Sequence, residues 1–331
     1  MLKLGVLTRE RFLSSRQGGA ASGLLKFFSR GRVSFQLLET ASQDSELFER
    51  LMPYIRLSSG TYRTTYRGRF RNLDPAVNQL LTTYFNSAEE LRVEDWAASA
   101  CLTSSEWAQS LFPLFPHLRF VASDILLNLV ELHDSDGGVF IFEPGGEPLQ
   151  FVRAPFVIRM TPPESWKLPV NYWICRKVWE RWRFLNPMPA PVKQCIDSPS
   201  QEPLVSNGIR LTKLSLVHPE PERLAQSDAR FATRCQSVFE PLSSAAHVIR
   251  TMNIFNRAYF SEEQLTKGTQ AVLESLLPGG VWILGRTTQE DPPVHEVTIL
   301  RKRDTNRLEV LKRLGSGSEI ESLVVRSNAG A

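Results

Sequence analysis

The chain has 331 residues, of which 42% are hydrophobic and 22% charged, and its formal net charge is +4. This composition excludes a mostly disordered chain, which would be poor in apolar residues, and a collagen-like chain, which would need many more than 19 glycines. No apolar run approaches the roughly 20 residues that cross a bilayer. We expect a folded protein with material for about two domains of ~150 residues.

The positive charge is concentrated in the first 34 residues, which hold seven basic groups and one acidic group. An Arg- and Ser-rich, acid-poor stretch is also the composition of an organelle transit peptide. The sequence favours a solvated basic arm on a cytoplasmic protein, with targeting or binding to an anionic membrane surface as the alternative. Residues 1–90 are predicted to form a basic, partly helical N-terminal extension.

The cysteines and histidines are scattered along the chain. None of the four cysteines forms a CxxC pair, so we expect reduced thiols in the cytoplasm. The five histidines show no zinc-ligand spacing, and no metal site is predicted.

A first block has the order of a nucleotide-binding β–α–β unit. Leu91–Asp95 is strand-like, and the run of small residues Ala97–Cys101 follows it. Thr103–Glu106 has the spacing of a capping box, which predicts that a helix begins there. Leu118–Ser123 then reads as a buried strand that ends at Asp124. In such units the small residues let the backbone approach a ligand, and the acid can accept from ribose hydroxyls. We expect the two strands to be neighbours.

A second block lies near the C-terminus. His247–Met252 is strand-like and precedes Asn253. Ser261–Gln264 predicts a capping box at the start of a helix with a regular apolar stripe. Pro278–Gly280 is predicted to end this helix, and Val281–Leu284 to form a short strand.

Two more strands are predicted at Glu296–Lys302 and Ile320–Arg326, separated by Leu308–Leu314. Strands after the last helix suit an antiparallel closure of an otherwise parallel sheet.

Together the two blocks resemble class I S-adenosylmethionine-dependent methyltransferases over roughly residues 90–135 and 230–325. Within that superfamily the pattern is most similar to the chemotaxis-receptor methyltransferases. Their fourth strand ends in Asn and is followed by Tyr-Phe, an acidic helix start and L-x-P-G-G. Asn253, Tyr259-Phe260 and Leu276–Gly280 match those positions.

This resemblance implies a Rossmann-like α/β methyltransferase sheet, mostly parallel with an antiparallel C-terminal strand and helices on both faces. It implies a methyltransferase-like domain over 91–331, interrupted by an insertion at about 134–228. It also implies S-adenosylmethionine as cofactor. The superfamily's loop usually reads D/E-x-G-x-G-x-G, whereas here all three glycine positions carry side chains. The cofactor-binding residues that the resemblance implies are Asp95, Ala97, Ser99, Cys101, Asp124 and Asn253.

Three of these residues keep alternative roles. Asp95 could orient the loop through backbone N–H groups or could bind the cofactor's amino group. Asp124 could instead cap a helix or face solvent in a turn. Asn253 could simply satisfy its own turn.

Two further segments combine aromatic and basic residues. Asn171–Leu185 predicts an amphipathic helix that could lie on a membrane, cover a pocket or, as we expect, dock on its own domain. It follows a hairpin predicted from Val139–Phe142 and Leu149–Arg153. Pro53–Asn72 has five arginines and no acid, which fits contact with nucleic acid but also an edge strand or loop.

The sequence therefore predicts methyl transfer from S-adenosylmethionine to an unknown acceptor, with catalytic residues unassigned. The first alternative is a non-catalytic Rossmann-like binding module that has lost its cofactor, because the loop lacks its glycines. The second is a protein associated with nucleic acid or an anionic surface.

Overall fold

The computed structural model describes residues 3–14, 32–160, 169–185, 189–198, 202–206, 209–303 and 307–326. The chain divides into two compact units. We call residues 65–127 with 220–331 the parallel unit, and residues 1–64 with 128–219 the antiparallel unit. The domain bounds expected from the sequence (1–90, 91–331 and an insertion at about 134–228) stay predictions. Residues 15–31 of the basic arm lie outside the described part of the chain.

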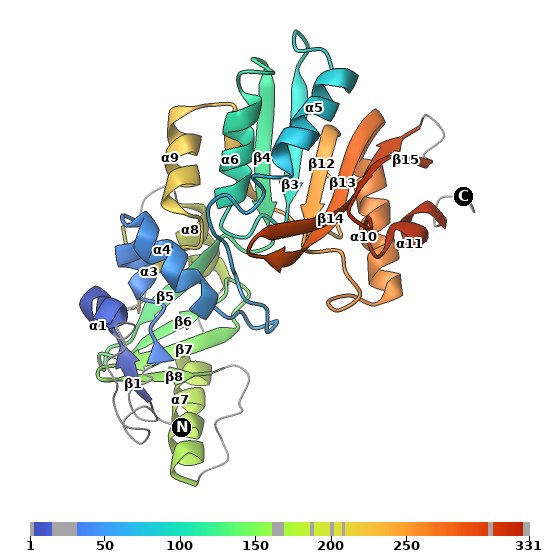
Figure 1. Cartoon of the computed structure of the whole chain (residues 1–331). Coiled ribbons are helices and arrows are strands. Elements are labelled where there is room, and N and C mark those ends of the chain that lie inside the picture. The colour runs from blue at the N-terminus through green and yellow to red at the C-terminus, as the bar shows by residue number, and fades with distance from the viewer. Residues whose placement is uncertain are drawn as a thin grey trace. The chain divides into compact units, whose positions relative to one another are not determined.

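The parallel unit contains a seven-stranded sheet (Figure 1). Its order is β11-β4-β3-β12-β13-β14-β15. The bounds are β11 (Phe231–Cys235), β4 (Leu118–Asp124), β3 (Leu91–Trp96), β12 (Ala246–Met252), β13 (Leu276–Glu290), β14 (Pro293–Lys302) and β15 (Leu308–Leu314).

Five of these strands are parallel, and the last two close the sheet as an antiparallel meander. β3 pairs with β4 in register from Leu91 opposite Leu118 to Trp96 opposite Ser123, which confirms the predicted neighbours. The order reverses between β3 and β12, so the strand ends diverge there. This is the crevice in which open α/β sheets bind ligands. The fold is thus a Rossmann-like, mostly parallel α/β sheet, as predicted.

The C-terminal end differs from the prediction. Leu308–Leu314, taken as a connection, is strand β15, and the predicted strand Ile320–Arg326 is helix α11 (Glu321–Arg326). Its apolar residues Ile320, Leu323 and Val324 have helical i, i+3, i+4 spacing and are all buried. The helical spacing of the apolar residues, and not their hydrophobicity alone, therefore determines that this segment is a helix.

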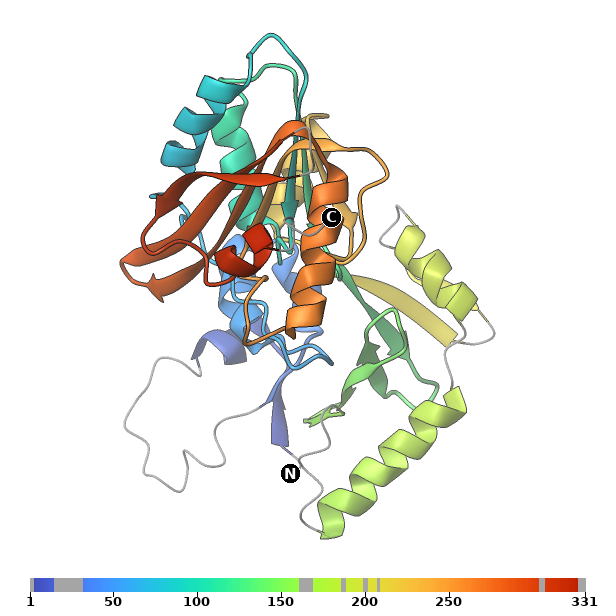
Figure 2. The same ribbon diagram turned by 90° about the vertical axis from the view of Figure 1, so that its right-hand side faces the viewer.

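Helices cover both faces of the parallel sheet (Figure 2). α10 (Glu262–Ser275) and α11 pack on one face, where Trp96, Ile249 and Trp282 belong to one buried cluster with residues of both helices. On the other face the Trp107 ring of α6 (Leu102–Leu111) meets the Phe120 ring of β4 edge-on at 5.3 Å. α5 (Asp74–Tyr84) precedes β3, and α9 (Pro219–Ser227) precedes β11.

Helix α10 has well-defined ends. The Ser261 hydroxyl accepts from the Gln264 amide and the Gln264 side chain from the Ser261 amide, which confirms the predicted capping box. The helix ends at Ser275, before Pro278–Gly280, which lies within the long strand β13 and not in a helix cap. The buried Lys302 ammonium donates to the carbonyl oxygens of Leu273 (2.6 Å) and Leu276 (2.7 Å). The Lys302 side chain of β14 therefore binds carbonyl oxygens at the end of α10 that have no partner within the helix.

The antiparallel unit is an eight-stranded sheet in the order β2-β1-β8-β7-β6-β5-β10-β9, with only β1 and β2 parallel. Its strands are β1 (Lys3–Val6), β2 (Arg32–Val33), β5 (Asn128–His133), β6 (Val139–Phe142), β7 (Pro148–Arg153), β8 (Phe156–Arg159), β9 (Leu204–Ser206) and β10 (Ile209–Ser215). Its helices are α1 (Arg9–Ser14), α3 (Leu37–Ala41), α4 (Ser45–Leu51), the 3₁₀ turn η1 (Met52–Tyr54), α7 (Pro169–Leu185) and α8 (Pro189–Asp197).

The predicted β6–β7 hairpin and the amphipathic helix α7 are both present. The helix buries Cys175, Val178 and Trp182 in a core with Phe140 and Phe142 of β6. This confirms that α7 docks on its own unit.

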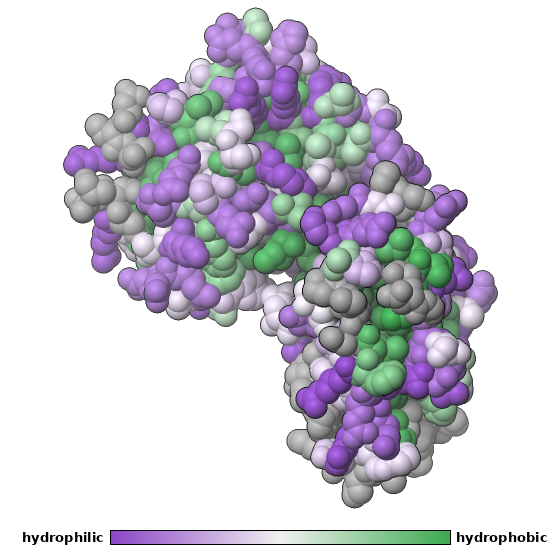
Figure 3. Space-filling view, turned by 180° about the vertical axis from the view of Figure 1, so that it is seen from behind, coloured by the Kyte–Doolittle hydropathy of each residue, from purple (hydrophilic) through white to green (hydrophobic). Residues whose placement is uncertain are grey.

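Within the described part of the chain, no helix is both long and apolar enough to span a membrane. Hydrophilic side chains cover much of the face shown in Figure 3, with hydrophobic residues between them.

Gly285 in the centre of β13 allows a close approach of β14. A Cβ there would lie 2.5 Å from the Glu296 carbonyl oxygen and 2.9 Å from the Val297 Cα. Gly285→Ala should lower the free energy of unfolding by roughly 1–3 kcal/mol, because backbone atoms have to move. Thr288→Ala, at an exposed position of the same strand, is the control and should change it by less than ~0.5 kcal/mol in urea titrations. Equal effects would contradict the register.

Candidate functional site

The loop between β3 and α6 has an unusual backbone. Ala97 (φ 57°), Ser99 (φ 54°) and Cys101 (φ 60°) are all left-handed, a conformation that glycine adopts freely and other residues adopt rarely. These are the three positions at which the resembling superfamily carries glycine. The three residues thus adopt a conformation that favours glycine although they carry side chains.

The side chains at the three positions are differently placed. Ala97 and Ser99 are half-buried, whereas Cys101 is completely buried and its Sγ lies 3.9 Å from the Ser99 carbonyl oxygen. The thiol therefore packs inward. Cys101 is the residue before α6, and its left-handed conformation replaces the side-chain cap expected from Thr103–Glu106. That capping box is wrong: Thr103 lies within the helix, and the Glu106 carboxylate accepts instead from the Gly68 amide (2.9 and 3.1 Å).

The loop amides are held by β4. The Ala98 amide donates to the Ser123 carbonyl at 2.9 Å, and the Ser99 amide donates to Asp124 Oδ2 at 2.8 Å. Asp124 Oδ1 accepts from the Leu126 amide at 3.2 Å. The structure thus brings Ser99 and Asp124 together at the carboxyl edge of the sheet. A carboxylate at this position is a hydrogen-bond acceptor of the kind that a ligand hydroxyl requires.

Ile125, the residue after Asp124, is 71% exposed and is the most exposed aliphatic side chain described in the parallel unit. Ile125 stands in no recognisable sequence motif and was not among the predicted site residues. An exposed aliphatic group beside a carboxylate suits a ligand with an apolar ring next to hydroxyl groups.

Asp95 lies at the end of β3 and is buried. Its Oδ1 accepts from Arg250 Nε (2.9 Å), and its Oδ2 accepts from Arg250 Nη2 (2.5 Å) and the Ser104 hydroxyl (2.6 Å). Arg250 also donates through Nη1 to Asp74 Oδ1 at 2.9 Å. These contacts are with side chains and not with the backbone N–H groups through which Asp95 was expected to orient the loop, so both expected roles stay predictions. Arg250 and Asp74 were missed, because neither stands in a recognisable motif.

Asn253 follows β12 and is also left-handed, at φ 63°. Its Oδ1 accepts from the Thr287 amide at 2.6 Å, and its own amide donates to the Gly285 carbonyl at 2.8 Å. The side chain therefore ties the end of β12 to β13. The contacts of Asn253 favour the turn role, two strands away from the Ser99–Asp124 pair.

The buried carboxyl groups of this unit have raised pKa values. Burial raises the pKa of Asp74 to about 7, against the opposing effect of Arg250. Burial likewise raises the pKa of Glu94 to about 7, although Arg234 lies 2.7 Å away. With Asp74 protonated, Arg250 and Asp95 form a buried pair without net charge, which is the form that a low-dielectric interior favours.

Three of the five arginines of the segment Pro53–Asn72 have partners within the chain. Arg67 pairs with Glu220 at 2.5 Å and Arg69 with Glu290 at 2.7 Å. Arg56 donates to the Gly60 carbonyl oxygen and lies over the Tyr62 ring. These contacts favour the loop interpretation over a nucleic-acid surface.

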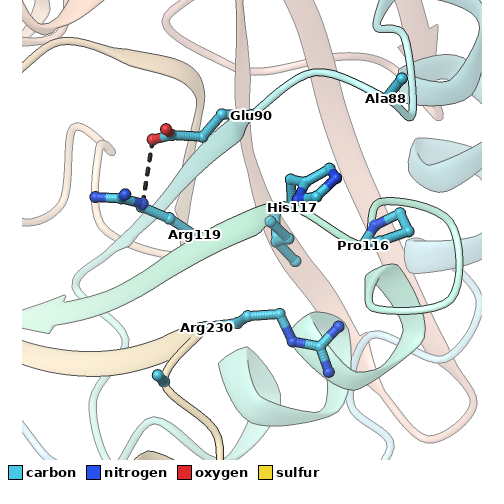
Figure 4. Close-up of a pocket in the computed structure, with 8 residues that line it drawn as sticks. Ala88, Glu90, Pro116, His117, Arg119 and Arg230 are labelled. Atoms are coloured by element: carbon cyan, nitrogen blue, oxygen red, sulfur yellow. Dashed lines mark ion pairs between the residues drawn. The ribbon is translucent and has the colours of Figure 1, made fainter.

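A hollow of about 600 Å³ lies at the opposite, amino edge of the sheet (Figure 4). Its charged groups already have partners: Arg119 pairs with Glu90 (3.2 Å), and Arg230 pairs with Asp228 (2.7 Å) and lies 4.0 Å over the Phe112 ring. The hollow is separate from the loop 97–101, which lies at the carboxyl edge. Among the described residues, no group of three or more His, Cys, Asp or Glu side chains could hold a metal ion.

Comparisons with known proteins leave the family open. No protein-family model matches the chain, and no curated protein does so either. The chain is similar to three solved methyltransferases among others. They are an O-methyltransferase family protein from Burkholderia thailandensis (11% identity, 78% of this chain and 46% of that one, TM-score 0.28), the citrinin polyketide synthase CMeT domain (11%, 77% and 43%, 0.33) and the sugar N-methyltransferase KedS8 from Streptoalloteichus sp ATCC 53650 (12%, 79% and 80%, 0.30).

The chain spans about half the length of the first two of these proteins. Scores this low assign no family and carry no functional argument.

The left-handed conformation of the loop leads to a testable prediction about the stability of the protein. Ala97→Gly should raise the free energy of unfolding by up to about 1 kcal/mol, because it relieves backbone strain and removes only a half-buried methyl group. The matched control is Ala98→Gly, one residue on, where φ is not positive; it should lower the value by about 1 kcal/mol. Equal losses in both variants, measured by urea unfolding, would show that residue 97 is not left-handed.

The raised pKa of Asp74 makes a pH prediction. Its folded pKa of about 7 lies above its ordinary value of 3.8, so its contribution to stability is fully present below 3.8 and is lost as pH rises through 7. Between pH 5 and pH 8 the wild type should lose roughly 2–3 kcal/mol through this group. Asp74→Asn should lose less over the same interval, the remainder coming from groups such as Glu94. An identical pH dependence of stability in the wild type and the variant would contradict the raised pKa of Asp74.

Proposed function

We propose that this chain transfers a methyl group from S-adenosylmethionine to an acceptor held at the carboxyl edge of the parallel sheet. The observation that carries the proposal is the loop 97–101, which keeps a glycine-type left-handed backbone at three alternate positions despite its side chains. Non-glycine residues in this region cost of order 1–3 kcal/mol each and cluster at functional sites. A loop without a ligand would have no need to retain them.

The residues fit such a cofactor in part. Asp124 would accept from ribose hydroxyls, and Ile125 would cover one face of an adenine ring. Ala97 and Ser99 lie on the half-buried side of the loop, and the inward packing of Cys101 keeps its thiol out of the ligand's space. Asp95 would act through the loop and not on the ligand. The cofactor, when bound, supplies an electrophilic methyl group on a sulfonium.

The chain's own contribution is then binding and orientation. The sheet edge would hold the acceptor in line with the bond that breaks, and positioning of this kind provides a large share of catalysis in group transfer. Asn253, Tyr259-Phe260 and Leu276–Gly280 support, within the superfamily, a likeness to the chemotaxis-receptor methyltransferases. The cytoplasm is proposed as the compartment, in keeping with the four free cysteines.

The second candidate is a non-catalytic module on the same fold. It is favoured by the full engagement of Asp95 with Arg250 and Ser104 and of Asn253 with Thr287, which removes two of the expected ligand contacts. The two candidates differ in whether the loop binds a ligand.

Calorimetric titration with S-adenosylhomocysteine separates them. The wild type should bind, and Asp124→Asn should weaken binding at least tenfold, since hydrogen bonds to a charged group are worth roughly 1.5–3 kcal/mol. Ile125→Ser should weaken it about fivefold through lost apolar contact. Leu114→Ser, at a half-exposed aliphatic residue beyond the far end of α6, is the control and should bind like the wild type. A folded wild type that does not bind at millimolar concentration would support the non-catalytic module.

A further inference from the structure

Arg250 is completely buried in the middle of the parallel sheet. It contacts four separate parts of the unit. Nε and Nη2 donate to Asp95 at the end of β3, and Nη1 donates to Asp74 in the first turn of α5. Its guanidinium carbon lies 4.1 Å from the Trp107 ring centre of α6 and 4.9 Å from that of Phe70.

This arrangement uses the planar fork of an arginine. Two nitrogens bind one carboxylate side-on, the third binds a second carboxylate, and the flat faces meet aromatic rings. A lysine has one compact charge and could not make all four contacts at once.

Both ends of the loop 97–101 depend on the carboxylate that Arg250 holds. Asp95 precedes Ala97 by two residues. On the other side, the Ser104 hydroxyl in the first turn of α6 donates to Asp95 Oδ2 at 2.6 Å. The loop therefore spans two points anchored on a single side chain, and that side chain is fixed by Arg250.

We propose that Arg250 is a positioning residue of the ligand site: through Asp95 and Ser104 it holds the loop 97–101 in its left-handed conformation. The ligand in this statement rests on the proposed function, whereas the effect on the loop does not. Three loop amides report on the effect. Those of Ala98, Ser99 and Cys101 are hydrogen-bonded to Ser123, Asp124 and Ala98 respectively, so they should exchange slowly with solvent.

The test removes the whole charge cluster without leaving a bare buried charge. The triple variant Arg250→Met/Asp95→Asn/Asp74→Asn replaces it with neutral groups of similar size, an exchange that folded proteins often tolerate. NMR hydrogen exchange should show the three loop amides exchanging at least tenfold faster than in the wild type. Amides in the middle of β13 should keep their protection. Binding of S-adenosylhomocysteine should weaken at least tenfold.

The matched control is a second arginine–acid pair of the same sheet, in which Glu94 is buried and the Arg234 side chain is 40% exposed. Glu94 adjoins Asp95 on the opposite face of β3 and pairs with Arg234 of β11 at 2.7 Å. Arg234→Met/Glu94→Gln removes a charge pair that neighbours Asp95 along β3 but has no hydrogen bond to Asp95 or Ser104. It should leave both the exchange of the loop amides and the affinity unchanged.

If the triple variant does not fold, Arg250→Lys takes its place, with an expected several-fold faster exchange at the same amides. Wild-type exchange of the three amides in a folded Arg250 variant overturns the proposal, as does equal acceleration in the control pair. Loop loosening in an otherwise folded protein whose wild type binds no ligand would keep the positioning role and reject the proposed function. The two failures are therefore distinguishable.

Discussion

The parallel unit depends on one buried cation. Removing one partner of a buried ion pair lowers the free energy of unfolding by about 3–5 kcal/mol. A charge in the middle of a sheet therefore requires its partners to stay in place. Arg250 needs carboxylates from the end of β3 and the start of α5, and aromatic faces from α6 and the segment before α5. The residues that make these contacts all lie within residues 70–107, whereas Arg250 follows them in sequence by more than 140 residues. Satisfying the guanidinium therefore fixes the carboxyl edge of the sheet on which the candidate site lies.

The loop beside this cation shows that residues with side chains can adopt a backbone conformation that favours glycine. Ala97, Ser99 and Cys101 adopt the geometry of glycine because both ends of the loop are anchored and its amides are bonded to β4. The strain is local, and its compensation lies in the ion cluster, the β4 contacts and the burial of the thiol. Under the proposed function, a ligand and not stability selects this conformation.

The sequence predicted the parts of the fold that follow from periodicity and capping. The strands Leu91–Asp95 and Leu118–Ser123 and the capping box at Ser261 are local signals, and the structure has all three. The segment Ile320–Arg326, predicted as a strand, forms a helix because its buried apolar residues have i, i+3, i+4 spacing. This spacing is difficult to recognise in a short hydrophobic run. Arg250 and Asp74 could not be predicted, since their meaning comes from contacts 155 and 176 residues apart in sequence.

The most direct test maps where a ligand binds. Amide chemical-shift changes on titration with S-adenosylhomocysteine should cluster at residues 97–101 and 124–126, at the carboxyl edge of the parallel sheet. The amide chemical shifts of residues 88–90 and 116–119, at the hollow of the amino edge, should not change. Shifts confined to that hollow, or none at saturating ligand, would contradict the assignment of the left-handed loop as a cofactor site.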